Sequence, residues 1–272
     1  MRITVLMENT CGARECLFEH GLSIYIETGL HRLLVDTGAS DAFLTNAGRL
    51  GIDLRAVDTV VVSHGHYDHA GGVMAFSQIN SHARIYIHRL AGEGYYHKNA
   101  LMEKYIGMDP RIRELPQVEW VEGDRVIDGE LSLFGSVSGR RLWPKGNREL
   151  MVKKGEVFAQ DEFLHEQYLA VEAEGRSLLV SGCAHNGILN ILDRYRERCG
   201  KDPDMVISGF HMSRKPPYRE EDLELVRETA QELKGLNVRF YTGHCTGEIP
   251  FQILKEVMGD QVVGLHSGME IQ

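Results

Sequence analysis

The chain has 272 residues, of which 43% are hydrophobic and 25% charged, an ordinary globular composition that can form a full hydrophobic core. Its 39 acidic and 30 basic side chains give a formal net charge of -9, which argues against general nucleic-acid binding, because such binding relies on basic surfaces. Five scattered cysteines do not predict a disulfide framework and are typical of a reducing compartment. No segment approaches the roughly 20 apolar residues of a membrane span, so we expect a cytoplasmic protein without a membrane partner.

The N-terminal quarter of the sequence alternates short apolar runs with turn signals, a pattern that predicts strands. The second and third runs are separated by a glycine turn and predict a hairpin that ends at Asp36. An aspartate in this setting is most often a turn former. The fourth run contains three consecutive valines and is typical of a buried strand. The expected strands are residues 3–7, 22–27, 31–35 and 57–62, with a helix at 41–50.

Directly after the valine-rich strand, residues 63–72 read Ser-His-Gly-His-Tyr-Asp-His-Ala-Gly-Gly. Alternate side chains of an extended segment point the same way, so His64 and His66 can reach one cation. The glycines then allow a sharp turn, after which Asp68 and His69 point elsewhere and suit a second cation nearby. A single histidine or aspartate in a loop is more often a surface residue or a helix cap. Four such side chains within six residues instead predict a metal site.

The rest of the chain alternates strand and helix signals, with polar residues where strands end. Residues 92–97 fit neither a helix nor a strand, and the many basic residues between 138 and 161 predict a solvated loop. This alternation predicts an α/β fold, a four-layer αβ/βα sandwich formed by one domain of residues 1–272, with the site along one edge of its two sheets. Expected strands are 84–87, 168–172, 177–180, 205–208 and 238–241, with short β-like runs between 118 and 137, and expected helices are 188–198, 220–234 and 251–257.

Four motifs together resemble a known family. His-Gly-His-Tyr-Asp-His at residues 64–69 is similar to the HxHxDH signature of the metallo-β-lactamase superfamily. Leu-Leu-Val-Asp-Thr-Gly at 33–38 resembles the strand and turn that precede this signature. Ser-Gly-Cys-Ala-His-Asn-Gly at 181–187 and Thr-Gly-His-Cys-Thr-Gly at 242–247 each follow a later strand. The combination resembles the branch of 7,8-dihydropterin-6-yl-methyl-4-(ribofuranosyl)aminobenzene-phosphate synthases and metal-dependent hydrolases, which implies the metallo-β-lactamase fold.

The resemblance also implies roles for residues around the metal loop. It places Asp36 behind the loop, where it would hold the loop without binding metal. It implies that an insertion around residues 90–165 borders the cleft. Tyr95, Tyr96 and His97 are therefore candidate substrate contacts, with plain packing as the equal alternative.

The expected metal ligands depart from the family pattern at one position. The resemblance implies a bridging aspartate after the strand at 177–180, but the sequence has Cys183 there. Either Cys183 gives a thiolate to the metal, or it is a small buried residue and His185 is the ligand. The first expectation is His185, the second His165 and the third Cys183. The two expected ligand sets are His64, His66 and His185 for one metal, and Asp68, His69 and His244 for the other.

The chemistry expected from these ligands is that of a two-metal hydrolase. Two divalent ions, zinc first and iron or manganese as alternatives, would activate water against an ester-like or phosphoester bond of a small molecule. Asp68 would orient that water, and His211, after a strand and a glycine, would donate a hydrogen bond to the developing anion. If the substrate is phosphorylated, its cationic partners are expected among the basic residues between 138 and 161.

Two other functions stay open. The branch implies a transferase that moves a phosphoribosyl group to an aminobenzoate-type acceptor. Alternatively, the metal is a structural element of a non-catalytic binding protein, although two clustered metals with open positions favour catalysis. A di-iron oxygen or nitric oxide reductase is disfavoured, because such members of the superfamily usually have a carboxylate at the position of His66.

Overall fold

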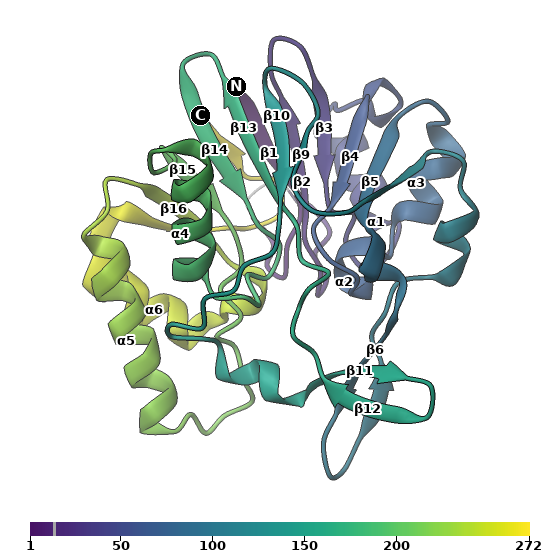
Figure 1. Cartoon of the computed structure of the whole chain (residues 1–272). Helices are drawn as coiled ribbons and strands as arrows, with labels where there is room; N and C mark the ends of the chain where they lie inside the picture. The colour runs from purple at the N-terminus through teal and green to yellow at the C-terminus, as the bar shows by residue number, and fades with distance from the viewer. Residues whose placement is uncertain (13–14) are drawn as a thin grey trace.

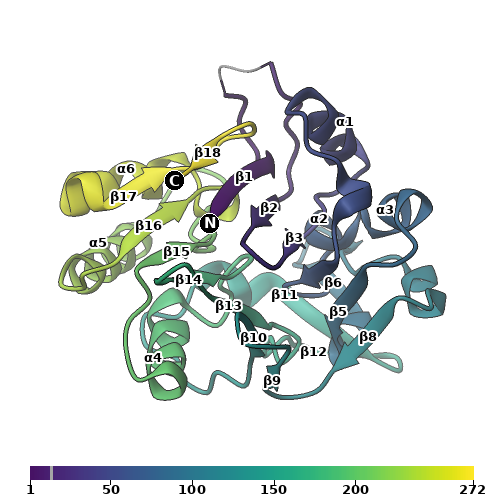
Figure 2. The ribbon, with the colours of Figure 1, turned by 90° about the horizontal axis from the view of Figure 1, so that it is seen from above.

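The computed structural model describes residues 1–12 and 15–272, and two β-sheets that face each other form its centre. Helices cover the outer face of each sheet, so the layers run helix, sheet, sheet, helix, as the view from above in Figure 2 shows. The predicted four-layer αβ/βα sandwich is therefore confirmed.

The first sheet has the strand order β18-β1-β2-β3-β4-β5-β8. Its first three junctions are antiparallel and its last three are parallel. The carboxyl ends of the four parallel strands therefore lie at one edge of the sheet. The strands are β1 (Arg2–Met7), β2 (Ser23–Glu27), β3 (Arg32–Val35), β4 (Thr59–Val62), β5 (Arg84–His88), β8 (Val118–Val121) and β18 (Glu270–Ile271).

The second sheet has the order β17-β16-β15-β14-β13-β10-β9 and repeats this arrangement. Three junctions, from β14 to β17, are parallel, and the remaining three are antiparallel. Its parallel strands thus also end together. The strands are β9 (Arg125–Val126), β10 (Leu131–Phe134), β13 (Tyr168–Ala173), β14 (Arg176–Val180), β15 (Met205–Ile207), β16 (Arg239–Thr242) and β17 (Val262–Gly264).

Helices α1 and α3 cover the outer face of the first sheet, and α4, α5 and α6 cover that of the second (Figure 1). The amphipathic helix α5 buries Val226, Ala230 and Leu233 against the second sheet, while its charged side faces solvent. No helix among the described residues is long and apolar enough to cross a membrane. The helices are α1 (Ala42–Arg49), α2 (Tyr67–Ala70), α3 (Val73–Ile79), α4 (Ile188–Cys199), α5 (Glu220–Lys234) and α6 (Glu248–Met258), with 3₁₀ turns η1 (Leu54–Ala56), η2 (Arg89–Gly92), η3 (Pro110–Glu114), η4 (Lys145–Glu149), η5 (His244–Thr246) and η6 (Gly259–Gln261).

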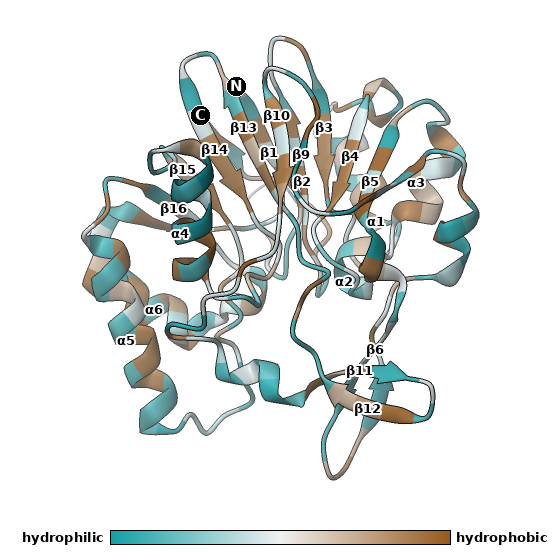
Figure 3. Cartoon of the chain, viewed as in Figure 1, coloured by the Kyte–Doolittle hydropathy of each residue, from teal (hydrophilic) through white to brown (hydrophobic). Residues whose placement is uncertain are grey.

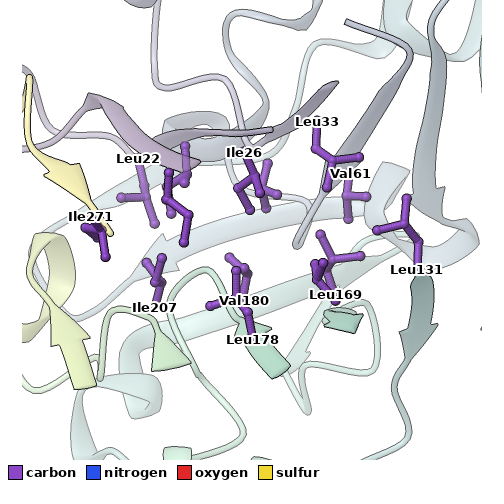
Figure 4. Packing of buried hydrophobic residues seen from close by; sticks show 14 of the residues in the cluster. Leu22, Ile26, Leu33, Val61, Leu131, Leu169, Leu178, Val180, Ile207 and Ile271 are labelled. Carbon is purple, nitrogen blue, oxygen red and sulfur yellow. The ribbon is translucent and has the colours of Figure 1, made fainter. Parts of the chain in front are cut away.

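The main hydrophobic core fills the space between the two sheets. Side chains such as Ile26 and Val61 from the first sheet face Leu169 and Val180 from the second, as Figure 4 shows. Hydrophobic colour follows the strands of both sheets in Figure 3. Burying each such side chain contributes roughly 1.5–3 kcal/mol, so this core fixes the two sheets, and the strand ends they carry, against each other.

A small third sheet lies apart from the sandwich, at the same end as the loops of the site (Figure 1). Two of its strands fall where the sequence predicted a solvated loop. The first of them buries Leu150 and Val152, and its lysines are Lys153, on the opposite face, and Lys154, its last residue. The cleft-bordering insertion expected around residues 90–165 is divided, since its middle strands β8 to β10 belong to the large sheets. The order is β12-β11-β6-β7, with β6 (Gly94–Lys98), β7 (Glu103–Tyr105), β11 (Leu150–Lys154) and β12 (Val157–Gln160).

Candidate metal centre

The predicted site residues come together where parallel strands of both large sheets end. Loops after β3 and β4 approach loops after β14, β15 and β16. The approach is close: a Cβ added at Gly182 would lie 2.1 Å from Oγ of Ser63, so only glycine fits there. Several non-glycine residues at these strand ends have left-handed backbone angles, a concentration typical of functional sites. These residues are Asp36 (φ 57°), Ala184 (φ 52°), His211 (φ 48°) and His244 (φ 51°).

Asp36 holds the metal loop from behind. Its carboxylate accepts hydrogen bonds from the backbone N–H of Ser63 at 2.7 Å, from the Ser63 hydroxyl at 2.7 Å and from Nδ1 of His69 at 2.6 Å. The Asp36 side chain is fully buried. Because Nδ1 of His69 donates to Asp36, Nε2 of the same ring points into the site.

Three imidazoles form one side of the site. The ring of His66 lies 4.6 Å from that of His64 and 4.9 Å from that of His185, and the His64 and His185 rings are 5.0 Å apart. Nε2 of each ring is buried and has no hydrogen-bond partner among the described residues. Burial, and then the neighbouring histidines, lowers the pKa of His66 to about 3 and those of His64 and His185 well below the usual range. These rings therefore stay neutral, as metal ligands must be.

A carboxylate and two imidazoles form the other side. Nε2 of His244 lies 3.2 Å from Oδ2 of Asp68 and 3.2 Å from Nε2 of His69. Burial would lower the pKa of His69, but the carboxylates of Asp36 and Asp68 outweigh it and raise that pKa to about 9. Burial would raise the pKa of Asp68, but the positive charge of His69 and the hydrogen bonds from His20 and His244 hold it well below the usual range.

Cys183 lies between the two sides. Its Sγ is 3.1 Å from Nε2 of His69. One group of potential ligand atoms, all within 4.8 Å of one another, contains Asp68, His69, Cys183 and His244, and another contains His64, Cys183 and His185. The residue at the position of the expected bridging aspartate is thus within reach of both ligand sets.

These donors fit divalent cations. A tetrahedral ion with bonds of about 2.0–2.3 Å separates its ligand atoms by roughly 3.3–3.8 Å. The 3.1–3.2 Å separations around His69 are close to that spacing. Buried imidazole nitrogens without a partner are costly unless a cation or a donor faces them, which makes the His64, His66 and His185 side a second fitting position.

His165, the second expectation for the missing ligand, is engaged elsewhere. Its Nδ1 accepts a hydrogen bond from the backbone N–H of Gly65 at 3.0 Å, and its Nε2 donates to Oδ2 of Asp161 at 3.0 Å. Both ring nitrogens are therefore occupied, and His185, whose Nε2 is unpartnered, is the better candidate.

Sequence reasoning missed the partners that orient two of the ligands. Oδ1 of Asn147 lies 2.9 Å from Nδ1 of His185, and Oδ1 of Asn9 lies 2.8 Å from Nδ1 of His244. Each contact leaves Nε2 facing the site. The asparagines lie 38 and 235 residues from the ligands they hold, and an asparagine in a loop has no local signal for such a role.

The three candidate substrate contacts lie in different surroundings. Tyr95 is 2% exposed, stacks on His165 with ring centres 4.0 Å apart and donates its hydroxyl to the backbone oxygen of Leu90, contacts that agree with the packing alternative. Tyr96 packs against Phe158 and Tyr105 in the small sheet. Of the three, His97 lines a cavity of about 1070 Å³, where it pairs with Glu149 at 3.0 Å.

This cavity opens onto the candidate metal centre. Its walls include His66, Asp68, Cys183, His185, His211 and His244. His211, predicted in the cleft, lies there with its ring centre 4.1 Å from that of His185. Its Nδ1 is buried and has no hydrogen-bond partner within residues 1–12 and 15–272. A small molecule in the cavity would therefore reach both ligand sets.

Comparisons with known proteins agree with this architecture. A family model of the metallo-beta-lactamase superfamily matches residues 17–147. The chain is 28% identical over 300 residues to the 7,8-dihydropterin-6-methyl-4-(beta-D-ribofuranosyl)-aminobenzene-5'-phosphate synthase of Methanocaldococcus jannaschii, covering 100% of this chain and 96% of the relative. It is also 28% identical over 219 residues to an uncharacterized protein of that organism, covering 77% of this chain and 79% of the relative.

A solved structure is similar over its full length. The crystal structure of Tm1679, a metal-dependent hydrolase of the beta-lactamase superfamily, is 30% identical with a TM-score of 0.83, covering 100% of this chain and 98% of that one. Together with the two seven-stranded sheets and the histidine-rich loop at their edge, these matches show that the chain belongs to the metallo-beta-lactamase superfamily.

Proposed function

We propose that this protein is a metal-dependent hydrolase that cleaves an ester-like or phosphoester bond in a small anionic molecule. The main support is the set of three buried imidazoles, His64, His66 and His185, beside a cavity large enough for a small molecule. Their Nε2 atoms have no hydrogen-bond partner among the residues that the structure describes. Two divalent cations, held by His64, His66 and His185 and by Asp68, His69 and His244, would supply Lewis acidity and activate water for attack.

Two side chains of the cavity are placed to assist the reaction. The Asp68 carboxylate is 11% exposed and ionised, so it can accept a hydrogen bond from an attacking water and orient it. Nδ1 of His211 has no partner in the part of the chain that the structure describes, and its ring lines the same cavity. His211 can therefore donate a hydrogen bond to an oxygen on which negative charge develops.

Zinc is our first choice of metal, with iron or manganese as alternatives. The ligand sets are rich in imidazole, and Cys183 adds a sulfur within reach of both. Soft thiolate and imidazole ligands favour zinc over manganese, which prefers oxygen.

The charge of the cavity wall favours an anionic substrate. The residues that line the cavity include five basic ones: Lys145, Arg148, Arg214, Lys215 and Arg219. Three of these cations are paired with acidic side chains, whereas Arg148 and Lys215 form no ion pair with any residue that the structure describes. In a protein of net charge -9, cations left without a carboxylate at a cavity wall support recognition of phosphate or carboxylate.

The alternative is a transferase. The match to the aminobenzene-phosphate synthase extends over the whole of this chain, so the same cavity would take a phosphorylated ribosyl donor and an aminobenzoate-type acceptor. A non-catalytic protein with structural metals is less well supported, because a structural metal does not require a cavity beside its ligands.

Elemental analysis combined with turnover tests the proposal. We expect two equivalents of divalent metal per chain and hydrolysis of chromogenic phosphodiesters or esters that stops on chelation. Arg148→Ala should raise KM for anionic substrates without lowering kcat. Two metals without any hydrolysis would transfer support to the transferase, and a chain that binds no metal would contradict both.

A further inference from the structure

We propose that His165 is a positioning residue of the metal centre rather than one of its ligands. It fixes the Gly65 peptide, and because His64 and His66 flank that glycine, it sets the direction of both imidazoles. The inference rests on the proposed metal centre and adds the device that orients its first ligand set.

The contacts of His165 determine its tautomer. Nδ1 accepts from the backbone N–H of Gly65 at 3.0 Å, so the ring proton is on Nε2, which donates to Oδ2 of Asp161 at 3.0 Å. The other oxygen of Asp161 accepts from the backbone N–H of Phe163 at 2.7 Å. The His165 side chain is 1% exposed and that of Asp161 4%, so water does not compete for these bonds.

The Gly65 peptide is a sensitive point of the metal loop. A Cβ at this position would lie 2.2 Å from the backbone oxygen of Ala91, so the loop passes too close to its neighbour for any other residue. Glycine at this point leaves the peptide free to rotate unless something holds it. His165 supplies the acceptor that holds it, and rotation of this peptide would turn both flanking imidazoles.

The same segment also supports the other half of the first ligand set. The ring of Phe163 stacks on that of His185 with centres 4.4 Å apart and planes 2° from parallel. Both oxygens of Glu166 accept backbone N–H groups of the β14 loop, at 2.6 Å from His185 and 2.9 Å from Asn186. Residues 161–167 thus contact the β4 loop through His165 and the β14 loop through Phe163 and Glu166.

The segment is tied to the small sheet as well. The backbone N–H of Asp161 donates to the oxygen of Leu150, the first residue of β11, at 3.1 Å. Tyr95 of β6 stacks on the face of His165. The sheet that stands beside the cavity therefore helps to set the position of His165, and through it the metal loop.

Two substitutions at one position separate the two bonds of His165. In His165→Asn, the amide oxygen takes the place of Nδ1 and still accepts from Gly65, but the contact with Asp161 is lost. In His165→Gln, the amide nitrogen takes the place of Nε2 and still donates to Asp161, but Gly65 loses its acceptor. Each variant loses one buried hydrogen bond, so a merely structural role predicts equal effects.

We expect unequal effects on metal binding. In His165→Gln, cobalt affinity at the position of the first ligand set should fall about 10–100-fold, as measured by competition with a chromophoric chelator. This is the range typical of losing a residue that orients a metal ligand. The cobalt affinity of His165→Asn should stay within about threefold of the wild-type affinity, a much smaller loss than in His165→Gln. The visible cobalt spectrum, which reports ligand geometry, should change in His165→Gln and remain wild-type in His165→Asn.

A matched control is His31→Gln. His31 also bonds two groups through its ring, Asp58 at 3.0 Å and Asp128 at 2.8 Å, but Asp58 precedes β4, at the opposite end of that strand from the metal loop. Cobalt affinity should be unchanged in this variant. A loss equal to that of His165→Gln would show that any damaged histidine contact weakens the site and would overturn the proposal.

Asp161→Asn weakens the contact between His165 and residue 161 without removing it. The amide oxygen can still accept a hydrogen bond from Nε2 of His165, but the negative charge of the carboxylate is lost. We expect an affinity between those of wild type and His165→Gln. If the wild-type protein binds cobalt but His165→Asn and His165→Gln bind it with equal affinity, the proposed role of His165 is overturned and the metal centre is not. A wild-type protein that binds no cobalt would instead overturn the proposed metal centre.

Discussion

The two ligand sets lie side by side but differ in charge. His64, His66 and His185 have no carboxylate among them, and burial keeps all three rings neutral. On the other side, Asp68 is ionised and His69, between Asp36 and Asp68, carries a proton up to a pKa of about 9. The first set can accept a cation directly, whereas a cation entering the second set must displace a proton.

The second set is already partly balanced in charge before metal binds. The proton on His69 offsets part of the negative charge of Asp36 and Asp68, whose carboxylates are deeply buried. A divalent cation that replaces this proton brings a larger positive charge to the same two carboxylates. The carboxylate side is thus the one whose occupancy responds to conditions, and the imidazole side is the constant one.

The largest expected effect comes from removing one ligand of each set. His185→Ala and His244→Ala should each lower the metal content from two equivalents to one and reduce turnover by more than 100-fold, beyond the 10–100-fold typical of outer partners. His82→Ala, which changes an exposed histidine, is the control and should retain both metals. If either ligand variant loses both metals or neither, the two sets are not separate positions.

Lowering the pH should separate the two sets next. Because one proton of His69 is displaced, affinity at the second position should fall tenfold per pH unit below about 9. Between pH 8 and pH 6 this amounts to roughly 100-fold, while the first position changes little because its histidines are already neutral. Metal titrations at the two pH values measure this, and equal losses at both positions would remove the proposed difference in charge.

A smaller effect is expected from the asparagines that orient one ligand in each set. Asn147→Ala should weaken binding at the first position about tenfold, and Asn9→Ala at the second, the lower end of the range for outer partners. Chelator competition on the two proteins tests whether each asparagine serves its own side. Cross effects of equal size would mean that the sets are coupled.

The smallest effect concerns stability at the far end of β4. Burial would lower the pKa of His31, but the hydrogen bond to Asp58 and the charge of Asp128 outweigh it and raise that pKa. The charged His31 therefore stabilises the fold fully at pH values below about 6.5, its pKa in the unfolded chain. This contribution is lost as the pH rises through the higher pKa of His31 in the folded protein. His31→Gln should cost less than about 1 kcal/mol in urea unfolding at pH 6, and less at pH 9 than at pH 6. An equal cost at both pH values would mean that charge is not involved.

The large sheets and the metal loop were predictable because their signals are local. The valine run at β4 and the histidine spacing directly after it need no distant partner to be interpreted. The small sheet was missed because β11 is short. Only Leu150 and Val152 alternate with less buried residues, and Lys153 and Lys154 then end the strand.

The finer parts of the site depend on contacts across the fold. Whether His165 or His185 is free to bind metal is decided by Asp161, Gly65 and Asn147. Gly65 belongs to the metal loop, but no local pattern links it to His165 or marks Asp161 and Asn147. Tyr95 resembled a cleft residue in sequence, but its ring is buried against His165. Side-chain direction at strand ends is set by packing and is not encoded in spacing alone.

Crystals of the zinc-loaded protein, with data collected above and below the zinc absorption edge, test the central claim most directly. We expect two anomalous peaks, one contacted by His64, His66 and His185 and the other by Asp68, His69 and His244. A single peak, or peaks bound elsewhere, would contradict the account of a two-cation centre.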